Sequence, residues 1–316
     1  MRKLRPITPD GALRMAMEQD AKAFLTRCWT CGTCDAECPV NEAAGRLRPR
    51  MLVRLATLGL IEEAISLPDI WYCIACNECA RVCPTLAIPS RLIASLRVKA
   101  LSAGVLSWGT YRRYARFVAA FQRVRWQVVS QCMEGSFEGI SDTQWEEWLQ
   151  TAVPQNRSIV KIQSLSKGSK ALRDAMARTQ SLSCFTCSEC SNACPQKSDR
   201  PVFDPQWITR MVNLGLGEEM LRSPSIWLCV QCEQCTKACT QSVEVHALIR
   251  ELREIALEEK IVDPDFQYRL KRAHRSVYSR YVKEVDRILA LPGCSGKQGT
   301  SPVDGEPPLL RQAMGG

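Results

Sequence analysis

The chain has 316 residues, enough for two domains of typical size, and its content of 46% hydrophobic and 24% charged residues excludes global disorder. It has eighteen cysteines, no apolar leader at the N-terminus and no apolar run of membrane-spanning length, so we expect a cytoplasmic, reducing location, no transmembrane segment, and metal binding rather than disulfides. The formal net charge of +9 would by itself favour an acidic partner.

Helices alternate with two cysteine motifs in the first part of the chain. Residues 8–25 carry cap signals followed by helix formers, and they precede the motif "CWTCGTCDAECP". Residues 48–65 predict an apolar helix that stops near Gly59 and then a short second helix. After the next motif, "CIACNECARVCP", residues 88–101 carry apolar residues at helical spacing. No sustained period-2 alternation appears, so the sequence predicts an all-α fold.

This arrangement returns 156 positions later, with the motifs "CFTCSECSNACP" and "CVQCEQCTKACT". Every cysteine of the first pair of motifs recurs at that offset, and no insertion or deletion is needed over about 80 residues of each copy. Other residues recur as the pairs Pro49/Pro205, Arg54/Arg210, Gly59/Gly215, Pro68/Pro224, Ile70/Ile226, Trp71/Trp227 and Arg97/Arg253. The chain is therefore interpreted as a tandem duplication of a two-motif unit.

The segment between the copies resembles neither of them. Residues 108–129 predict an amphipathic, arginine-rich helix that packs against both lobes, with a partner-docking surface or a membrane-surface anchor as alternatives. In residues 141–150, Ser141 and Gln144 have the spacing of a capping box. The expected organisation is two dicluster domains over residues 10–105 and 166–265, a helical linker over 106–165, and a C-terminal helix with a disordered tail over 266–316.

The cysteine spacing suits a cubane of four irons and four sulfides. Three cysteines two residues apart let one short loop hold three corners of a cluster, while the fourth ligand comes from elsewhere. Structural zinc, the alternative, usually takes two pairs of cysteines separated by a longer loop, which fits four runs of three plus one poorly.

In two-cluster ferredoxins the last cysteine of each motif ligates the other cluster. By this analogy, the ligand sets in the first copy are Cys28, Cys31, Cys34 and Cys83, then Cys73, Cys76, Cys79 and Cys38. The sets in the second copy are Cys184, Cys187, Cys190 and Cys239, then Cys229, Cys232, Cys235 and Cys194. The predicted cofactors are thus four [4Fe-4S] clusters.

Residues outside this pattern receive simpler interpretations. Cys132 and Cys294 are interpreted as free thiols, and His246 and His274 as surface or packing residues without a counterpart in the other copy. The tryptophans before each second motif are expected to shield the clusters. Only the fourth motif lacks a final proline and has Thr240 instead, which leaves one more amide donor near sulfur and is expected to raise the potential of the cluster bound by Cys239.

The motif regions resemble the C subunit of heterodisulfide reductases. The likeness covers residues 20–103 and 176–262 and rests on "CGTCDAECPVN", "LGLIEEAI", "DIWYCIACNECARVCP" and "SIWLCVQCEQCTKACT" with the helices that follow. The resemblance implies two tandem α-helical ferredoxin-like domains, each with two [4Fe-4S] clusters on the cysteines named above. This sequence departs from the family in fusing two copies and in lacking the fourth proline.

The resemblance also implies an electron-transfer role between two heterodisulfide reductase-like partners, a flavin-bearing protein of the A type and a catalytic protein of the B type. No adjacent cysteine pair, flavin fingerprint or other catalytic constellation appears, so no catalytic residue is expected. The alternatives are the iron–sulfur subunit of a membrane-associated respiratory oxidoreductase that exchanges electrons with quinone, and a binding protein without redox duty. Four clusters would carry about −8 in total, so the basic residues are read as internal counter-charge and no nucleic-acid partner is expected. The expected location is the cytoplasm, with peripheral membrane association within a complex as the variant.

Overall fold

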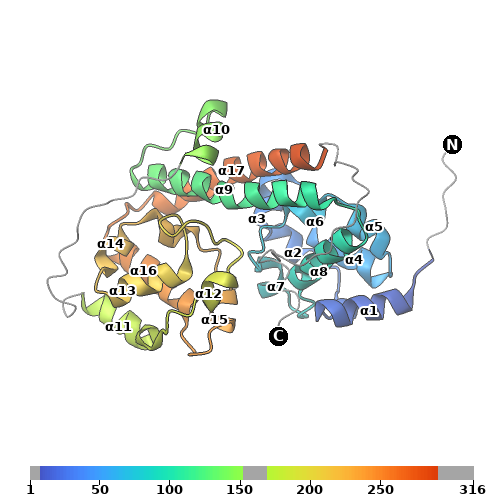
Figure 1. Cartoon of the computed structure of the whole chain (residues 1–316), viewed down its shortest axis with the longest axis horizontal. Helices are drawn as coiled ribbons and strands as arrows, with labels where there is room; N and C mark the ends of the chain where they lie inside the picture. The colour runs from blue at the N-terminus through green and yellow to red at the C-terminus, as the bar shows by residue number, and fades with distance from the viewer. Residues whose placement is uncertain (1–7, 152–168, 291–316) are drawn as a thin grey trace. The chain divides into compact units, whose positions relative to one another are not determined.

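The computed structural model describes residues 8–151 and 169–290, which fold into helices and connecting turns with no strand among them (Figure 1). The predicted all-α fold is therefore confirmed. The described residues form two compact units. The first unit consists of the residues up to Tyr114 and those from Tyr278 onward, and the second consists of Ala115–Val277.

The first unit contains eight complete α-helices and one 3₁₀ helix. In chain order they are α1 (Gly11–Ala21), η1 (Leu25–Arg27), α2 (Thr33–Ala36), α3 (Pro39–Ala44), α4 (Pro49–Thr57), α5 (Ile61–Ser66), α6 (Asp69–Tyr72), α7 (Glu78–Arg81) and α8 (Pro89–Ser102). The unit is completed by the start of α9 (Trp108–Met133) and by the end of α17 (Phe266–Ala290).

The second unit contains the rest of α9, the start of α17 and the elements between them. These elements are α10 (Asp142–Gln150), α11 (Lys170–Arg178), η2 (Ser181–Ser183), α12 (Glu189–Asn192), α13 (Pro205–Asn213), α14 (Gly217–Leu221), η3 (Pro224–Leu228), α15 (Gln234–Lys237) and α16 (Val245–Glu258).

The duplication seen in the sequence is repeated in the helices. Five elements of the first copy have the same bounds in the second when shifted by 156 residues, namely η1, α2, α4, α7 and α8, which correspond to η2, α12, α13, α15 and α16. The main difference is α3, whose equivalent stretch in the second copy consists of turns. Two copies of one sequence pattern thus produce two copies of one helix arrangement.

The long helices extend this repeat beyond the region of sequence identity. α9 follows α8 and α17 follows α16, and the two long helices overlap almost completely at the same offset. Each begins in the unit of its own copy and ends in the other unit. The sequence predicted a helix at both places but not this exchange, because few residues match between the two helices.

Several predicted local signals explain where the helices start and stop. Asp10 caps α1 by accepting the amide N–H groups of Ala12 and Leu13, and the predicted capping box of Ser141 and Gln144 is present at α10. α4 ends at Thr57, as the position of Gly59 indicated. Gly59 has φ +75°, and a Cβ added there would lie 2.0 Å from the carbonyl oxygen of Asp10, so only glycine fits.

The core of each unit is centred on the helix that follows its second motif. In the first unit, α8 buries the predicted stripe of Leu92, Ile93 and Leu96 against α1, α4 and α5. In the second, α16 buries Leu248, Ile249 and Leu252 against α11, α13 and α14. These helices hold the cysteine loops in place. Within residues 8–151 and 169–290, no helix combines the length and apolarity that crossing a bilayer requires.

Candidate metal centres

The four cysteine loops share an unusual backbone. The residue two positions after the first cysteine is left-handed in every motif: Thr30, Ala75, Thr186 and Gln231 have φ between +54° and +57°. The residue after the second cysteine is left-handed as well, at Gly32, Asn77, Ser188 and Glu233. Left-handed conformations are costly for residues other than glycine, yet they recur here on different side chains. The loop conformation therefore correlates with the spacing of the cysteines and not with the identity of the residues between them.

This backbone directs amide N–H groups at sulfur. The amides of Thr30, Ala75, Thr186 and Gln231 each donate to the first cysteine Sγ of their motif at 3.4 Å. The amides of Ala87 and Val243 donate at 3.3 Å to Cys83 Sγ and Cys239 Sγ. Donors aimed at sulfur stabilise thiolates and tune iron–sulfur clusters, so these loops fit the predicted cofactor.

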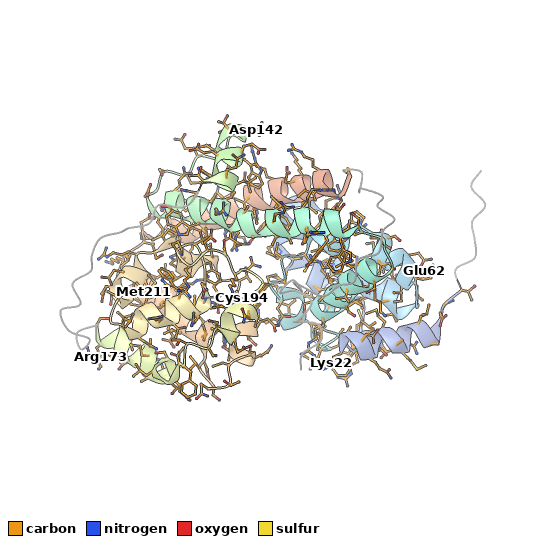
Figure 2. The ribbon with its side chains drawn as sticks, in the orientation of Figure 1. Lys22, Glu62, Asp142, Arg173, Cys194 and Met211 are labelled. Atoms are coloured by element: carbon orange, nitrogen blue, oxygen red, sulfur yellow. The ribbon has the colours of Figure 1, made fainter. Side chains whose placement is uncertain are left out.

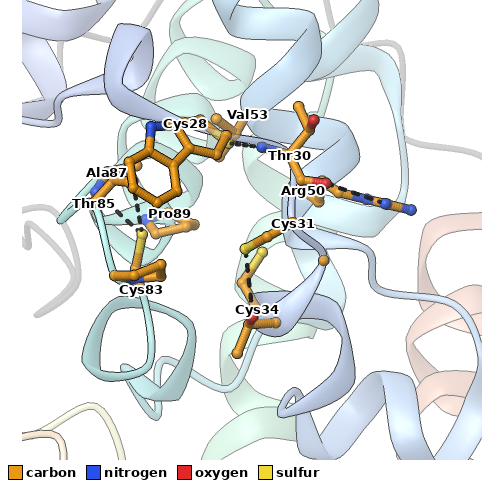
Figure 3. Close-up of a pocket in the computed structure, with 14 residues that line it drawn as sticks. Cys28, Thr30, Cys31, Cys34, Arg50, Val53, Cys83, Thr85, Ala87 and Pro89 are labelled. Carbon is orange, nitrogen blue, oxygen red and sulfur yellow. Dashed lines mark hydrogen bonds between the residues drawn. The ribbon is translucent and has the colours of Figure 1, made fainter.

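The first thiol set lines a hollow in the first unit, here called the first outer hollow. Cys28, Cys31 and Cys34 come from one motif, and Cys83 comes from the other. Figure 3 shows Cys31 and Cys34 facing Cys83 across this hollow, whose empty volume, open solvent included, is about 370 Å³. Cys31 is exposed, so one edge of the set faces solvent.

The second thiol set lines a hollow of about 320 Å³, the first inner hollow. Here Cys73, Cys76 and Cys79 come from the second motif, and Cys38 comes from the first. Both Cys38 and Cys79 are buried. The eight motif cysteines of the first unit thus line two hollows, each with three cysteines from one motif and one from the other.

In the second unit, the second inner hollow of about 310 Å³ is lined by Cys229, Cys232 and Cys235 with Cys194, which Figure 2 labels. The second outer set is the predicted group of Cys184, Cys187, Cys190 and Cys239. Cys184 raises the pKa of its neighbour Cys190, Cys187 is exposed, and Cys239 receives the same amide bond as its counterpart Cys83. The grouping of these four cysteines remains a prediction.

Burial controls the proton affinity of most of these thiols. It raises the pKa of Cys34 and Cys190 to about 12, and that of Cys38 and Cys232 to about 11, with neighbouring cysteines adding to the effect. The exposed Cys31 is the opposite case, because a hydrogen bond with the Thr33 hydroxyl lowers its pKa. Thiolates at the buried positions therefore need a strong local positive charge, which iron would supply.

Single-ion sites are a separate question from cluster sites. Across the described ranges, no three or more His, Cys, Asp or Glu side chains lie in an arrangement that could hold one metal ion. The thiols instead surround hollows of similar volume in groups of four.

Two partly exposed arginines, Arg97 and Arg253, bind the backbone beside the inner hollows, and the sequence analysis assigned them no role. Arg97 donates to the carbonyl oxygens of Ile70 and Cys73, and Arg253 donates to those of Ile226 and Cys229. Each guanidinium thus binds the peptide of a proposed ligand. Their recurrence at the repeat offset was the signal that could have identified them.

The remaining candidates take varied positions. His246 lines the second inner hollow, with its Nδ1 atom 2.7 Å from the Thr236 hydroxyl, so its interpretation as an ordinary surface or packing residue overlooked its place beside the thiols. Burial lowers the pKa of His246.

The other residues singled out in the sequence lie elsewhere. Trp71 packs on Tyr111 and Tyr114. Cys132 is fully buried away from the four sets, and Cys294 lies outside the described residues.

Comparison with known proteins gives two matches to family models. Residues 23–86 and residues 183–244 each match a model described as a 4Fe-4S dicluster domain. Two dicluster domains in one chain correspond to four [4Fe-4S] clusters. No solved structure gives a significant match.

Similar curated proteins are C subunits of heterodisulfide reductases. The C subunit of an H₂:CoB–CoM heterodisulfide, ferredoxin reductase from Methanothermobacter thermautotrophicus is 28% identical over 100 residues, which are 32% of this chain and 49% of the relative. The iron–sulfur C subunit (form 2) of a CoB–CoM heterodisulfide reductase from Methanocaldococcus jannaschii is 30% identical over 108 residues, 34% of this chain and 56% of the relative. A protein named as similar to this C subunit, from Archaeoglobus profundus, is 32% identical over 73 residues, 23% and 39% of the two chains. The chain spans about half the length of the first two relatives.

Proposed function

Because the chain belongs to the family of heterodisulfide reductase C subunits, as a tandem of two 4Fe-4S dicluster domains, we propose that it transfers electrons within a heterodisulfide reductase-like complex. It relays electrons through four [4Fe-4S] clusters between a flavin-bearing protein of the A type and a catalytic protein of the B type. The single observation that carries the proposal is the grouping of thiols, three from one motif and one from the other, around hollows of similar volume.

The proposed ligands follow the thiol sets. In the first unit the clusters are held by Cys28, Cys31, Cys34 and Cys83, and by Cys38, Cys73, Cys76 and Cys79. In the second unit they are held by Cys194, Cys229, Cys232 and Cys235, and by Cys184, Cys187, Cys190 and Cys239. The proposed dicluster domains are residues 10–105 and 166–265, with a helical linker over 106–165, and the proposed location is the cytoplasm.

Proximity of the two sets within each unit supports conduction. Burial raises the pKa of Cys79 in the first inner hollow, and Cys34 of the first outer hollow is among the neighbouring cysteines that add to this rise. In the second unit, Cys190 of the outer set acts in the same way on Cys235 of the inner set. Groups that influence one another electrostatically in a protein interior are near neighbours, so a cluster at one set lies near a cluster at the other.

Exposed aromatic side chains support exchange of electrons with other proteins of the complex at the outer sets. Trp29 and Phe185 occupy equivalent places directly after the first cysteine of their motifs, and they are 74% and 71% exposed. Large exposed aromatic residues are unusual on a monomer surface and are enriched in protein interfaces. Trp29 also lines the first outer hollow. We therefore propose that redox partners dock over Trp29 and Phe185.

Anaerobic purification with iron and sulfide analysis tests the cofactor content. The expected result is about sixteen irons per chain, from four cubanes, and a broad visible absorbance that dithionite bleaches reversibly. A preparation with intact thiols and about eight irons or fewer contradicts the proposal.

The crossed ligands are tested by a matched pair of variants, Cys38→Ala and Cys83→Ala. Each is expected to perturb the cluster of the other motif in the first unit, so electron paramagnetic resonance should change for a different cluster in each variant. Cys132→Ala is the control, because this buried thiol lies outside the four sets and its loss should leave all cluster signals unchanged. The crossing is wrong if Cys38→Ala and Cys28→Ala give the same altered signal.

A further inference from the structure

The two inner hollows correspond position by position, so the residues that differ between them can be compared directly. Five positions that line both hollows differ at the repeat offset: Val40 and Gln196, Leu47 and Phe203, Ile74 and Val230, Asn77 and Glu233, and Ser90 and His246; Glu78 lines the first hollow only, and its equivalent is Gln234. The change from Val40 to Gln196 places a buried amide at the wall of the second inner hollow, where the first has only a hydrocarbon side chain.

Arg125 lies directly behind that amide. It is 2% exposed, and its Nη1 atom donates to Gln196 Oε1 at 2.9 Å and to Gln122 Oε1 at 2.8 Å. Its Nη2 atom donates at 2.9 Å to the carbonyl oxygen of Leu228, the residue before the proposed ligand Cys229. All these acceptors are uncharged, and among the described residues no carboxylate forms an ion pair with Arg125.

Among the described residues, two guanidinium groups therefore bind the backbone beside the second inner hollow, those of the buried Arg125 and the partly exposed Arg253, whereas one, that of Arg97, does so beside the first. Arg253 is common to both, since Arg97 takes the same place in the first unit. The position equivalent to Arg125 is Tyr281, which lies in the first unit and is 1% exposed. Burial raises the pKa of Tyr281 far above its usual value, so this residue is a neutral phenol.

Two carboxylates of the second unit oppose the charge of Arg125. Asp204, at the position of Arg48 in the first unit, is 4% exposed and lies between the lining residues Phe203 and Pro205, but its side chain accepts hydrogen bonds from the Ser191 hydroxyl and the Trp207 amide and acts on Cys190 of the outer set. Glu233 adds a carboxylate at the second inner hollow, but its side chain is 44% exposed and pairs with Lys237 at 3.4 Å. Solvent and the lysine screen this negative charge. His274 packs near both arginines, and its pKa is about 3 because of burial and the two guanidinium groups, so it stays neutral.

We infer that the cluster held by Cys194, Cys229, Cys232 and Cys235 has a higher reduction potential than the cluster held by Cys38, Cys73, Cys76 and Cys79, and that Arg125 and Gln196 are the residues that set the difference. The inference rests on the proposed function. A thiolate-ligated cubane is negatively charged and gains a further negative charge on reduction, so a buried, unpaired cation favours the reduced form. Between the two inner sites, an electron therefore resides at the one in the second unit.

The test is a redox titration of the whole protein followed by electron paramagnetic resonance. Cys194→Ala identifies the signal of the second inner cluster by its loss. Arg125→Gln removes the charge and is expected to lower the potential of the cluster that gives this signal. The reduction equilibrium constant should fall on the order of tenfold, which is about 59 mV for a one-electron couple. Arg125→Lys keeps the charge and should restore most of the potential.

Two further variants separate charge from packing. Arg123→Gln makes the same chemical change two residues earlier on α9, where the side chain is paired with Asp199 at the surface, and it should leave the signal unchanged. Gln196→Val introduces the residue of the first unit without touching any charge, and a smaller fall in potential is expected. The inference is overturned if Arg125→Gln and wild-type protein titrate at the same potential, or if Arg123→Gln shifts it equally.

Iron analysis of the same samples shows whether a negative result contradicts this inference alone or the proposed function as well. Clusters that are present at full content with equal inner potentials contradict this inference alone. Absence of the clusters from wild-type protein contradicts the proposed function itself.

Discussion

At the level of single residues, two arginines that bind the backbone distinguish this protein from an ordinary helical bundle. Arg97 and Arg253 are partly exposed and bind backbone carbonyl groups rather than carboxylates, an arrangement that is costly for a charge drawn away from water. Clusters with four thiolate ligands would supply the missing negative charge. The basic net charge of the sequence is thus partly located next to the proposed ligands, as the sequence interpretation of internal counter-charge requires.

His274 gives the protein a specific dependence on pH. Burial and the neighbouring Arg125 and Arg253 lower its pKa to about 3, so the folded protein holds it neutral while the unfolded chain binds a proton below about pH 6.5. Its stabilising contribution is therefore complete above that pH and is lost as the pH falls. Between about pH 6.5 and about pH 5, it should lower the free energy of unfolding by up to about 1.4 kcal/mol for each pH unit.

Chemical unfolding of the second unit at a series of pH values measures this effect. His274→Gln should lose this part of the pH dependence, and His246→Gln, the matched control at the other histidine, should keep most of it. Equal slopes for wild-type protein and His274→Gln would show that His274 is not held neutral.

Thr240 is expected to raise the potential of the cluster bound by Cys239. It is exposed and has an amide N–H that proline lacks, next to a sulfur that already accepts the amide of Val243. Thr240→Pro should lower the potential of this cluster. The reduction equilibrium constant should fall by about threefold to tenfold, which corresponds to the loss of one hydrogen bond. Pro84→Thr is the reciprocal variant in the first unit and should act in the opposite direction. A redox titration in which both variants shift the same way contradicts the explanation.

At the scale of elements, the long helices are the feature that couples sequence-distant parts of the chain. In the first unit, the Tyr72 hydroxyl donates to Asp286 of α17, which also pairs with Arg46 at 3.3 Å. The same end of α17 buries Tyr281, Val282 and Val285. The first unit therefore depends on residues that follow the second copy in the sequence.

Truncation after Val277 should consequently destabilise the first unit. Loss of the buried aliphatic side chains of Val282, Val285 and Ile288, each worth roughly 1.5–3 kcal/mol, removes about 5–9 kcal/mol from that unit, and loss of the buried Tyr278 and Tyr281 adds to this. Hydrogen exchange is expected to rise in α3 to α6, more than in α11 to α16 of the second unit. A chain that ends at Ala290 is the control and should keep wild-type protection. Faster exchange confined to the second unit would refute the assignment of residues 278–290.

At the level of the whole molecule, the exposed motif cysteines belong to the proposed outer sets, and the buried ones belong to the inner sets except Cys190. Cys31 and Cys187 are exposed, whereas Cys38, Cys79, Cys232 and Cys235 are buried. The outer sets also carry the exposed aromatic residues proposed for docking. Within each unit, an electron that arrives at the proposed outer cluster would reach the proposed inner cluster without crossing the surface again.

Exposure to oxygen should therefore remove iron in two phases. The outer clusters are expected to be lost first, releasing about half of the iron, because oxidants reach exposed ligands most easily. Iron release can be followed with a chelator while electron paramagnetic resonance identifies the surviving clusters. Variants that lack the outer sets, Cys31→Ala with Cys187→Ala, should show only the slow phase. A single phase in wild-type protein contradicts unequal protection.

The helical class, the duplication and the spacing of the cysteine motifs can be read from the sequence, because they follow from patterns that are local along the chain. The motif spacing predicts the ligand triplets, and Gly59 marks the end of α4 through its own backbone conformation. The pairing of Cys83 with the first motif needed an analogy to known ferredoxins, and the structure brings that cysteine to the same hollow.

The residues that surround each cysteine group are known only from the tertiary structure. Arg125 and Gln196 are 71 positions apart, and Tyr72 and Asp286 are 214 apart, so no pattern along the chain relates them. The exchange of the long helices likewise leaves no periodic signal, since an amphipathic helix reports that one face is buried and not which unit buries it. The physical reason is that burial and electrostatic environment arise from packing between distant segments, whereas loop conformation and ligand spacing arise from the segment itself.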